Sequence, residues 1–264
     1  MQPDAFLFGK FLITLVSEDC IFRISGPQIR TEKGNYQLRS RSIRTIRRAE
    51  LSKAAFEAVV LYGLRGTTLE KVGEIAGVSK GVVLHHFKDK SSLLEAVIRR
   101  TNGMLSTSLV ELYRHADSPY ERLWAIIIAN FHESIFNQAV CQAWVSLMAE
   151  VPHNRDSQRV QTANYARVAS NFAHELKHFV PRPEARIIAR HLNLLIDGIW
   201  VRVGSRVEPL DAARAIGDLE YELMKFLPAD ENSRAQHKAA REKIENVARI
   251  ALGTRAFLEN SMAR

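Results

Sequence analysis

The stretch LEKVGEIAGVSKGVVLHHF, residues 69–87, decides the fold class of this chain. Its apolar residues recur at helical spacing and predict two short helices joined by a tight turn at Ala76-Gly77-Val78. Gly77 can adopt a backbone conformation that is costly for other residues, small Ala76 lets the helices approach, and Val78 fills the angle between them. The pattern is typical of a helix-turn-helix, whose second helix presents its N-terminal end to DNA base edges.

The apolar residues before this motif predict a first helix. From Ser40 onward they recur at intervals of three and four, and Gly63 and Gly66 are expected to end the helix. Thr67 and Glu70 have the spacing of a capping box, so the next helix is expected to begin at Thr67.

The rest of the chain also predicts helices. Ser79 and Asp89 are suited to cap the third and fourth helices. No alternating strand pattern of useful length is found, so the expected fold is all-α. Helices are expected to be separated by short breaks at Ser118-Pro119, Pro152, Pro181-Arg182-Pro183 and Glu208-Pro209.

These patterns divide the chain into four expected segments. Residues 1–38 lack a helical period and form an N-terminal extension of unknown role, unless translation starts near Leu38. Residues 39–88 are expected to form a three-helix DNA-binding domain with the helix-turn-helix, and residues 89–228 an α-helical domain. Residues 229–264 are expected to form a charged, helical and weakly anchored tail.

The charge of the chain predicts a polyanionic partner. A formal net charge of +8 in 264 residues fits either nucleic acid or an anionic membrane surface, so the placement of the charge must decide. Arginines are concentrated directly before the first amphipathic run, which favours an arm that reaches the DNA backbone or minor groove over a merely solvated face. The cluster comprises Arg39, Arg41, Arg44, Arg47 and Arg48.

Several other classes of protein are disfavoured. The longest apolar stretch, residues 6–16, is too short to span a membrane, and Asp4 before it does not fit a signal peptide. Cys20 and Cys141 are far apart in the sequence and are expected to be lone thiols rather than a disulfide or metal ligands. A cytoplasmic protein without a membrane partner is therefore expected.

The helix-turn-helix and its surroundings resemble the DNA-binding domain of TetR-family transcriptional regulators. The resemblance is carried by the arginine-led first helix, Thr68, residues 76–79, Gly81, residues 85–87, and Lys90 before Leu93-Leu94. It implies a non-enzymatic regulator without a cofactor that binds a pseudo-palindromic double-stranded DNA operator as a homodimer. The ligand-binding helical domain is implied to form the dimer through helices at about residues 186–203 and 211–227.

The resemblance and the chemistry of the residues together predict the DNA contacts. Ser79, Lys80 and Gly81 lie at the N-terminal end of the second helix, and Lys80 is the best candidate to read a base. The full expected set is Arg44, Arg47, Thr68, Ser79, Lys80, Gly81, His85, His86, Lys88 and Lys90. His86 departs from the family pattern, which usually has tyrosine there, and a histidine contact would depend on pH near its reference pKa of about 6.5.

The second half of the chain is similar to the BetI-type, choline-sensing repressors of glycine betaine synthesis. Asn130-Phe131, Ala143-Trp144 and residues 195–202 carry that similarity. Choline is therefore the expected effector, and a quaternary ammonium ion is bound by aromatic faces and a carboxylate. The candidate ligand contacts are Phe131, Trp144, Glu150, Tyr165, Asp197 and Trp200. Ordinary core aromatics are the alternative, as is a different amphipathic or cationic ligand.

One further motif points to another class of protein. His174-Glu175-Leu176-Lys177-His178 matches H-E-x-x-H, in which two histidines bind zinc and the glutamate acts as a base. Lys177 and the absence of a third ligand at a telling spacing argue against a zinc hydrolase, so neither a metal site nor a catalytic residue is expected. Another alternative is a module that has lost DNA recognition and binds a protein partner.

Overall fold

The fold is known from a computed structural model that describes residues 7–8, 11–12 and 32–253, with side chains from Ile43 onward. Two short strands, β1 (Leu7–Phe8) and β2 (Phe11–Leu12), pair antiparallel, and all other described elements are helical, which confirms the all-α expectation. The chain divides into two units, Met1–Ser40 and Arg41–Arg264, and every contact below lies within the second. Cys20 and the side chains of Arg39 and Arg41 lie outside the described residues.

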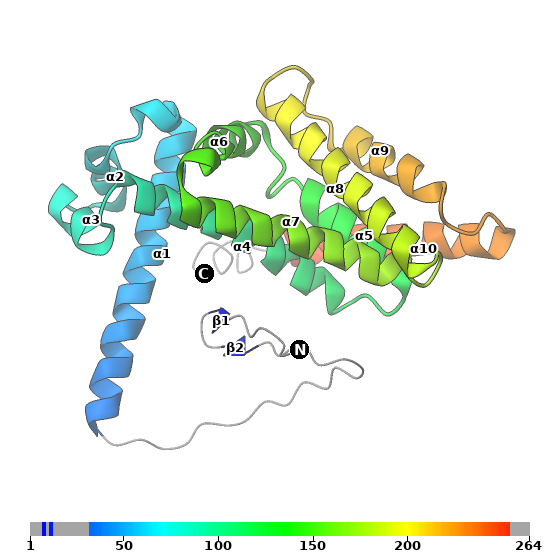
Figure 1. Cartoon of the computed structure of the whole chain (residues 1–264), viewed down its shortest axis with the longest axis horizontal. Coiled ribbons are helices and arrows are strands. Elements are labelled where there is room, and N and C mark those ends of the chain that lie inside the picture. Colours follow the sequence, from blue (N-terminus) through cyan, green and yellow to red (C-terminus); the bar gives the residue numbers. More distant parts are fainter. Residues whose placement is uncertain (1–6, 9–10, 13–31, 254–264) are drawn as a thin grey trace. The chain divides into compact units, whose positions relative to one another are not determined.

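Four helices begin the main part of the molecule (Figure 1). They are α1 (Glu32–Gly66), α2 (Leu69–Ala76), α3 (Lys80–His86) and α4 (Lys90–Tyr113). Helix α1 breaks at Gly63, whose φ of 65° is unfavourable for residues with a side chain. The expected caps Ser79 and Asp89 are confirmed, because each side chain accepts a hydrogen bond from the backbone three residues later.

Two sequence expectations about these helices were wrong. Helix α1 begins at Glu32 instead of near Ser40, so the arginine cluster belongs to a helix rather than to an extended arm. Lengthening a formed helix needs no new nucleus, which outweighs a local turn signal such as Gly34-Asn35. Thr68, not Thr67, caps α2, because the Thr67 hydroxyl donates to the Gly63 carbonyl, 2.8 Å away, where it closes α1.

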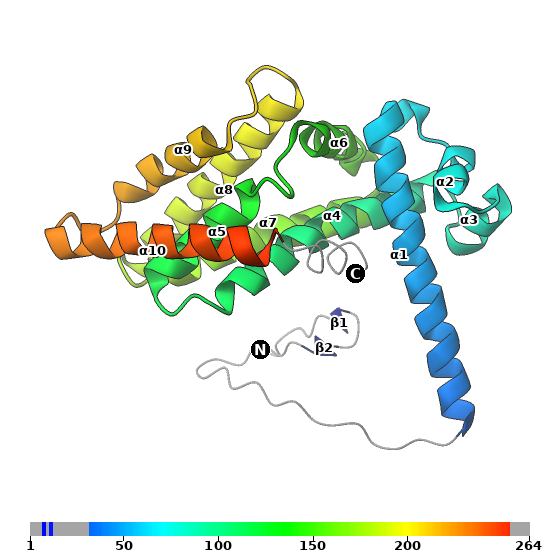
Figure 2. The same cartoon turned by 180° about the vertical axis from the view of Figure 1, so that it is seen from behind.

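The remaining helices pack around α5 (Pro119–Phe131), which is buried along nearly all of its length (Figures 1 and 2). A helix that is apolar all round belongs in the interior. Its neighbours include α4, α7 (Arg155–Leu176), α9 (Ala212–Met224) and α10 (Glu231–Ala251). Outside this layer, α8 (Arg182–Gly204) packs on α6 (Gln138–Met148) and α7, and a short 3-10 helix, Val151–His153, leads into α7.

Helix α4 contributes to both hydrophobic cores of the molecule. Its first turns, with Leu93, Leu94, Val97 and Ile98, are buried in one core with α1, α2 and α3. Leu112 at its other end is buried in the second core with α5, α8 and α10. The expected boundary between residues 88 and 89 therefore falls at the start of a helix that packs with both parts of the chain.

The C-terminal helix α10 is firmly docked, so the expectation of a weakly anchored tail was wrong for Glu231–Ala251, and residues 254–264 lie outside the described residues. The indole Nε1 of Trp124 donates to the His237 carbonyl at 3.2 Å, and the His237 ring lies 3.1 Å from a Glu220 carboxylate oxygen. Lys243 Nζ contacts Asp117 and Glu121 at 2.8 and 2.7 Å. The irregular apolar spacing did not reveal these polar contacts, and those of Trp124, Asp117 and Glu121 join residues more than a hundred positions apart.

The end of α8 depends on a residue without a side chain, which yields a stability prediction. A Cβ atom at Gly204 would lie 2.4 Å from the carbonyl oxygen of Cys141. We expect Gly204→Ala to lower the free energy of unfolding by about 1–3 kcal/mol through overpacking. Gly103→Ala is the control, because nothing lies within 4 Å of a Cβ there, and it should be neutral or stabilising by up to about 1 kcal/mol. Equal denaturation midpoints for the two variants would contradict this account.

Candidate DNA-binding surface and ligand cavity

Helices α2 and α3 meet in a close turn that resembles the expected geometry with one difference. Gly77 is left-handed, with φ 66° and ψ 31°, and the Val78 amide donates to the Gly73 carbonyl at 2.8 Å. A close approach that was not expected occurs at Gly73, where a Cβ would lie 2.6 Å from the Val78 oxygen. An isolated glycine inside a helical pattern was the signal that could have indicated this.

Helix α3 presents much of its surface to solvent. Val83 and Phe87 are buried in the core beside α1, and the exposed positions include Gly81, His85 and the following Lys88. Lys80, the expected base reader, is engaged with Glu70 of α2, because its Nζ lies 2.5 Å from the carboxylate. Both side chains are about half exposed, so the pair is weak, and contact with DNA can open it at little cost.

Other basic residues near the motif hold it against its neighbours. Arg48 donates to the carbonyl of His86, and its guanidinium lies 4.2 Å from the centre of the Phe87 ring. Lys90, an expected DNA contact, donates to the Leu64 carbonyl at 2.8 Å. The bracing role of Arg48 was not predicted, because only the tertiary structure brings α1 to the end of α3.

Three more expected contacts lie at the exposed surface of the motif. Arg44 is exposed, and Arg47 is paired with Glu50 at 2.7 Å. The Thr68 hydroxyl accepts the Lys71 amide at 3.3 Å, which leaves its own hydrogen able to donate.

His86 is half-buried, and its Nδ1 has no hydrogen-bond partner in the part of the chain that the structure describes. Burial lowers the pKa of the ring, and the charges of His85 and the nearby arginines lower it further. The ring is therefore neutral at pH 7, and any effect of its protonation falls below its usual pKa of about 6.5.

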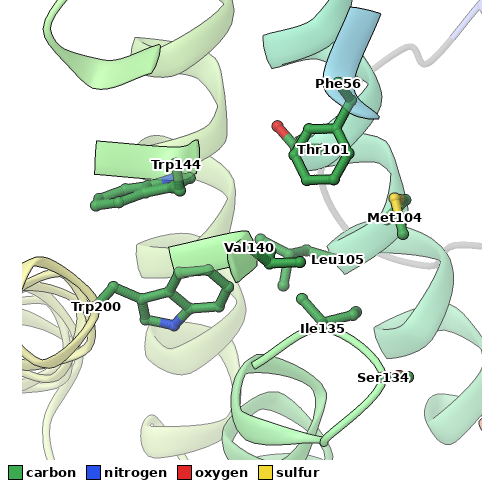
Figure 3. A pocket seen from close by; sticks show the side chains of 9 residues that line it. All are labelled: Phe56, Thr101, Met104, Leu105, Ser134, Ile135, Val140, Trp144 and Trp200. Carbon is green, nitrogen blue, oxygen red and sulfur yellow. The ribbon is translucent and has the colours of Figure 1, made fainter. Parts of the chain in front are cut away.

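An apolar cavity lies between α1, α4, α6 and α8 (Figure 3). Its empty volume is about 390 Å³ including the opening to solvent. Trp144 and Trp200 face Phe56, Thr101 and Met104 across it. The two indole rings are 5.8 Å apart between centroids and tilted by 59°. The lining residues are Phe56, Thr101, Met104, Leu105, Ser134, Ile135, Val140, Trp144 and Trp200.

The structure separates the expected ligand contacts. Of the aromatic ones, Phe131 is buried in the core and reaches Trp200 only through Phe136, which was not predicted. Asp197 and Tyr165 interact with each other elsewhere: burial raises the pKa of Asp197 to about 7, and burial together with the Asp197 charge raises that of Tyr165. Neither these two residues nor Glu150 line the cavity.

The H-E-x-x-H motif does not form a catalytic zinc site. Glu175 is buried in the protein, whereas His174 and His178 are exposed to solvent. The carboxylate therefore does not face an ion held by the two rings. Lys177 Nζ lies 3.3 Å from His174 Nδ1 and would repel a cation there. None of the described helices is long and apolar enough to cross a membrane.

A helix-turn-helix with an exposed second helix, joined to a helical domain, defines a DNA-binding transcriptional regulator. Residues 51–97 match the family model described as bacterial regulatory proteins, tetR family, and residues 119–228 match the C-terminal domain of the BetI-type transcriptional repressor. The HTH-type transcriptional regulator BetI of Serratia proteamaculans is 37% identical over 173 residues, 65% of this chain and 87% of that protein. BetI of Stenotrophomonas maltophilia is 32% identical over 188 residues, 69% and 96% of the two chains. The chain belongs to the TetR family of transcriptional regulators, with a BetI-type C-terminal domain.

Solved structures share this fold. A TetR transcription regulator from Haloarcula marismortui superposes with a TM-score of 0.63 at 17% identity, over 71% of this chain and all of that one. A putative transcriptional regulator from Pseudomonas aeruginosa PAO1 gives 0.60 at 21% identity, over 74% and 94%. Helix α10 lies beyond the residues that the BetI-type model matches.

The Lys80–Glu70 pair leads to a prediction about DNA affinity. Glu70→Gln removes a carboxylate beside α3 and releases the Lys80 ammonium. We expect tighter binding to a mixed-sequence duplex and a salt dependence steeper by about one phosphate contact. Binding titrations at several salt concentrations measure both. Glu242→Gln on α10 is the control and should change neither. An unchanged affinity and slope in Glu70→Gln would show that Glu70 does not compete with DNA for Lys80.

Proposed function

We propose that this regulator is a homodimeric repressor in the cytoplasm that releases its operator when choline binds, and that it controls glycine betaine synthesis or related genes. The sequence similarity to BetI proteins supports the class of target genes. The observation that carries the choline assignment is the pair of tilted indole rings in the apolar cavity. A trimethylammonium group has no hydrogen-bond donors on its methyl face, and aromatic faces are suited to bind it.

The cavity also supports a route from ligand to DNA. Thr101, Met104 and Leu105 bring α4 to its wall, and Phe56 brings α1. The first turns of α4 are buried with the helix-turn-helix, so a ligand that moves α4 also moves α3. In a dimer that movement changes the distance between two recognition helices, which must match the groove spacing of a pseudo-palindrome.

A second candidate ligand has support from the same cavity. Among the described residues that line it there is no carboxylate, and its walls are almost entirely apolar. Such a lining also fits the apolar part of an uncharged amphipathic metabolite.

Choline binding can be tested directly with the full chain on DNA upstream of its own gene. We expect choline to weaken operator binding at fixed salt, and Trp144→Leu to weaken choline binding by about tenfold through loss of a cation–π contact. Trp144→Phe keeps a ring and should lose less. Calorimetry for the ligand and anisotropy for the DNA measure the two effects.

The uncharged isostere 3,3-dimethylbutan-1-ol is the matched control, because it has the shape of choline without the charge. Choline should bind more tightly than this alcohol. Equal affinity would contradict cation recognition and favour the second candidate, while binding of neither compound would overturn choline as effector and leave the DNA-binding activity in place.

The dimer proposal rests on α8. Ile187, Leu194 and Val201 are exposed by 57%, 56% and 44%, and they lie seven residues apart on one side of the helix. The three side chains form an apolar stripe, interrupted by polar residues, that a second copy can cover. Tyr221 on α9, exposed by 71%, adds to the unpartnered apolar surface of these two helices.

Leu194→Glu should separate the subunits, because it places a charge in the middle of that stripe. We expect a monomer by sedimentation and an operator affinity lower by about 100-fold, since the two half-sites are no longer bound together. Val110→Glu on α4 is the control, because Val110 is equally exposed, at 54%. A dimeric Leu194→Glu protein would rule out this interface.

A further inference from the structure

Helix α3 carries two exposed apolar side chains on a surface that is otherwise suited to DNA. Val82 is 36% exposed and Leu84 is 41% exposed. Their neighbours Val83 and Phe87 are 0% and 1% exposed, so the helix is well packed and its two outward apolar residues are not the result of a loose core. A single exposed apolar residue needs no explanation, but here two of them occur in a helix of seven residues.

The polar groups of the same helix are already partly engaged within the protein. Lys80 is paired with Glu70 at 2.5 Å, and the Ser79 hydroxyl oxygen caps the helix through the Val82 amide at 3.4 Å. His86 is half-buried, and its carbonyl accepts a hydrogen bond from Arg48. The outward surface that remains is formed largely by Val82, Leu84 and His85.

Helix geometry places these three side chains on different sides of the outward surface. Leu84 follows Lys80 by four residues and therefore lies one turn further along the same side. His85 follows Gly81 by four residues and lies on the side of the helix opposite the buried Val83. Val82 lies next to His85 on the side away from Leu84. The two apolar residues thus border His85 on both sides.

The major groove offers one kind of apolar group, the C5-methyl of thymine. An exposed aliphatic side chain on a recognition helix gains by covering such a methyl, because both lose contact with water. Beside cytosine or the other groups of the groove, the same side chain would cover polar atoms without satisfying them.

We propose that Val82 and Leu84 read thymine methyl groups in each operator half-site, so that base discrimination by α3 is largely apolar. The proposal rests on α3 being the helix that enters the major groove. It assigns the choice of base to two residues that were absent from the expected contacts, and it leaves to Lys80 and Lys88 the attraction to phosphate.

The test removes the methyl and nothing else. Duplexes are selected from a random pool with the full-length protein, and each thymine of the resulting operator is then replaced by deoxyuridine. We expect one or two positions per half-site at which affinity falls about fourfold for each lost methyl contact. Anisotropy titrations at one salt concentration give these affinities.

Variants assign each methyl to its side chain. In Leu84→Ala the uracil penalty should disappear at one position, and in Val82→Ala at another, while penalties elsewhere remain. Leu61→Ala is the matched control, because Leu61 is an exposed leucine, at 60%, on α1. Circular dichroism of each variant checks that it is folded, and the salt dependence on a mixed-sequence duplex should be unchanged.

The outcomes distinguish a failure of methyl reading from a failure of α3 as the recognition helix. Uracil substitutions without effect at every position, or penalties that persist undiminished in both alanine variants, would overturn methyl reading while DNA binding stands. Selection that enriches no sequence would overturn both the recognition role of α3 and the inference. Loss of dimerisation in Leu84→Ala would show that a second copy of the chain, not DNA, covers this side chain, and would also overturn it.

Discussion

The packing of α4 in two hydrophobic cores is the constraint on which the rest of the structure depends. The helix has 24 residues and is about 36 Å long. Leu93 and Val97 tie one end to the helix-turn-helix, and Leu112 ties the other to the helices around α5. Because close-packed cores resist continuous deformation, a shift of α4 in one core must be accommodated in the other. The helix-turn-helix and the helical domain that contains the cavity are thereby connected through one element.

The ligand cavity lies beside this shared helix. Its walls include Phe56 of α1 and Met104 of α4, and Trp144 and Trp200 form the opposite side. An occupant there would contact α1 and α4 on one side and α6 and α8 on the other. The same arrangement explains why the cavity is apolar: it is a gap at the junction of packed helices, and a buried charge at that place would cost free energy without a partner.

On the proposed DNA-facing surface, several basic groups are engaged within the protein. Arg48 and Lys90 hold α1 and α4 against the motif through backbone carbonyls, and Lys80 is paired with Glu70. Such contacts position α3, which is the requirement for reading a groove. Helix α10 adds stiffness at the other end of the molecule, where His237 and Lys243 connect it to the helices before it.

Local sequence was enough to predict most helices, the caps at Ser79 and Asp89, and the turn at Gly77, because these depend on neighbours within four residues. It did not locate the start of α1 or the cap of α2. The motif around residues 76–87 likewise indicated the family, since its spacing reflects how two short helices pack around one turn. The packing of the helices was needed to show that Trp144 and Trp200 share a cavity while Asp197 lies outside it, that Lys80 meets Glu70, and that α10 is anchored. Those contacts join residues from different helices, and their formation depends on how whole helices pack, which periodicity does not specify.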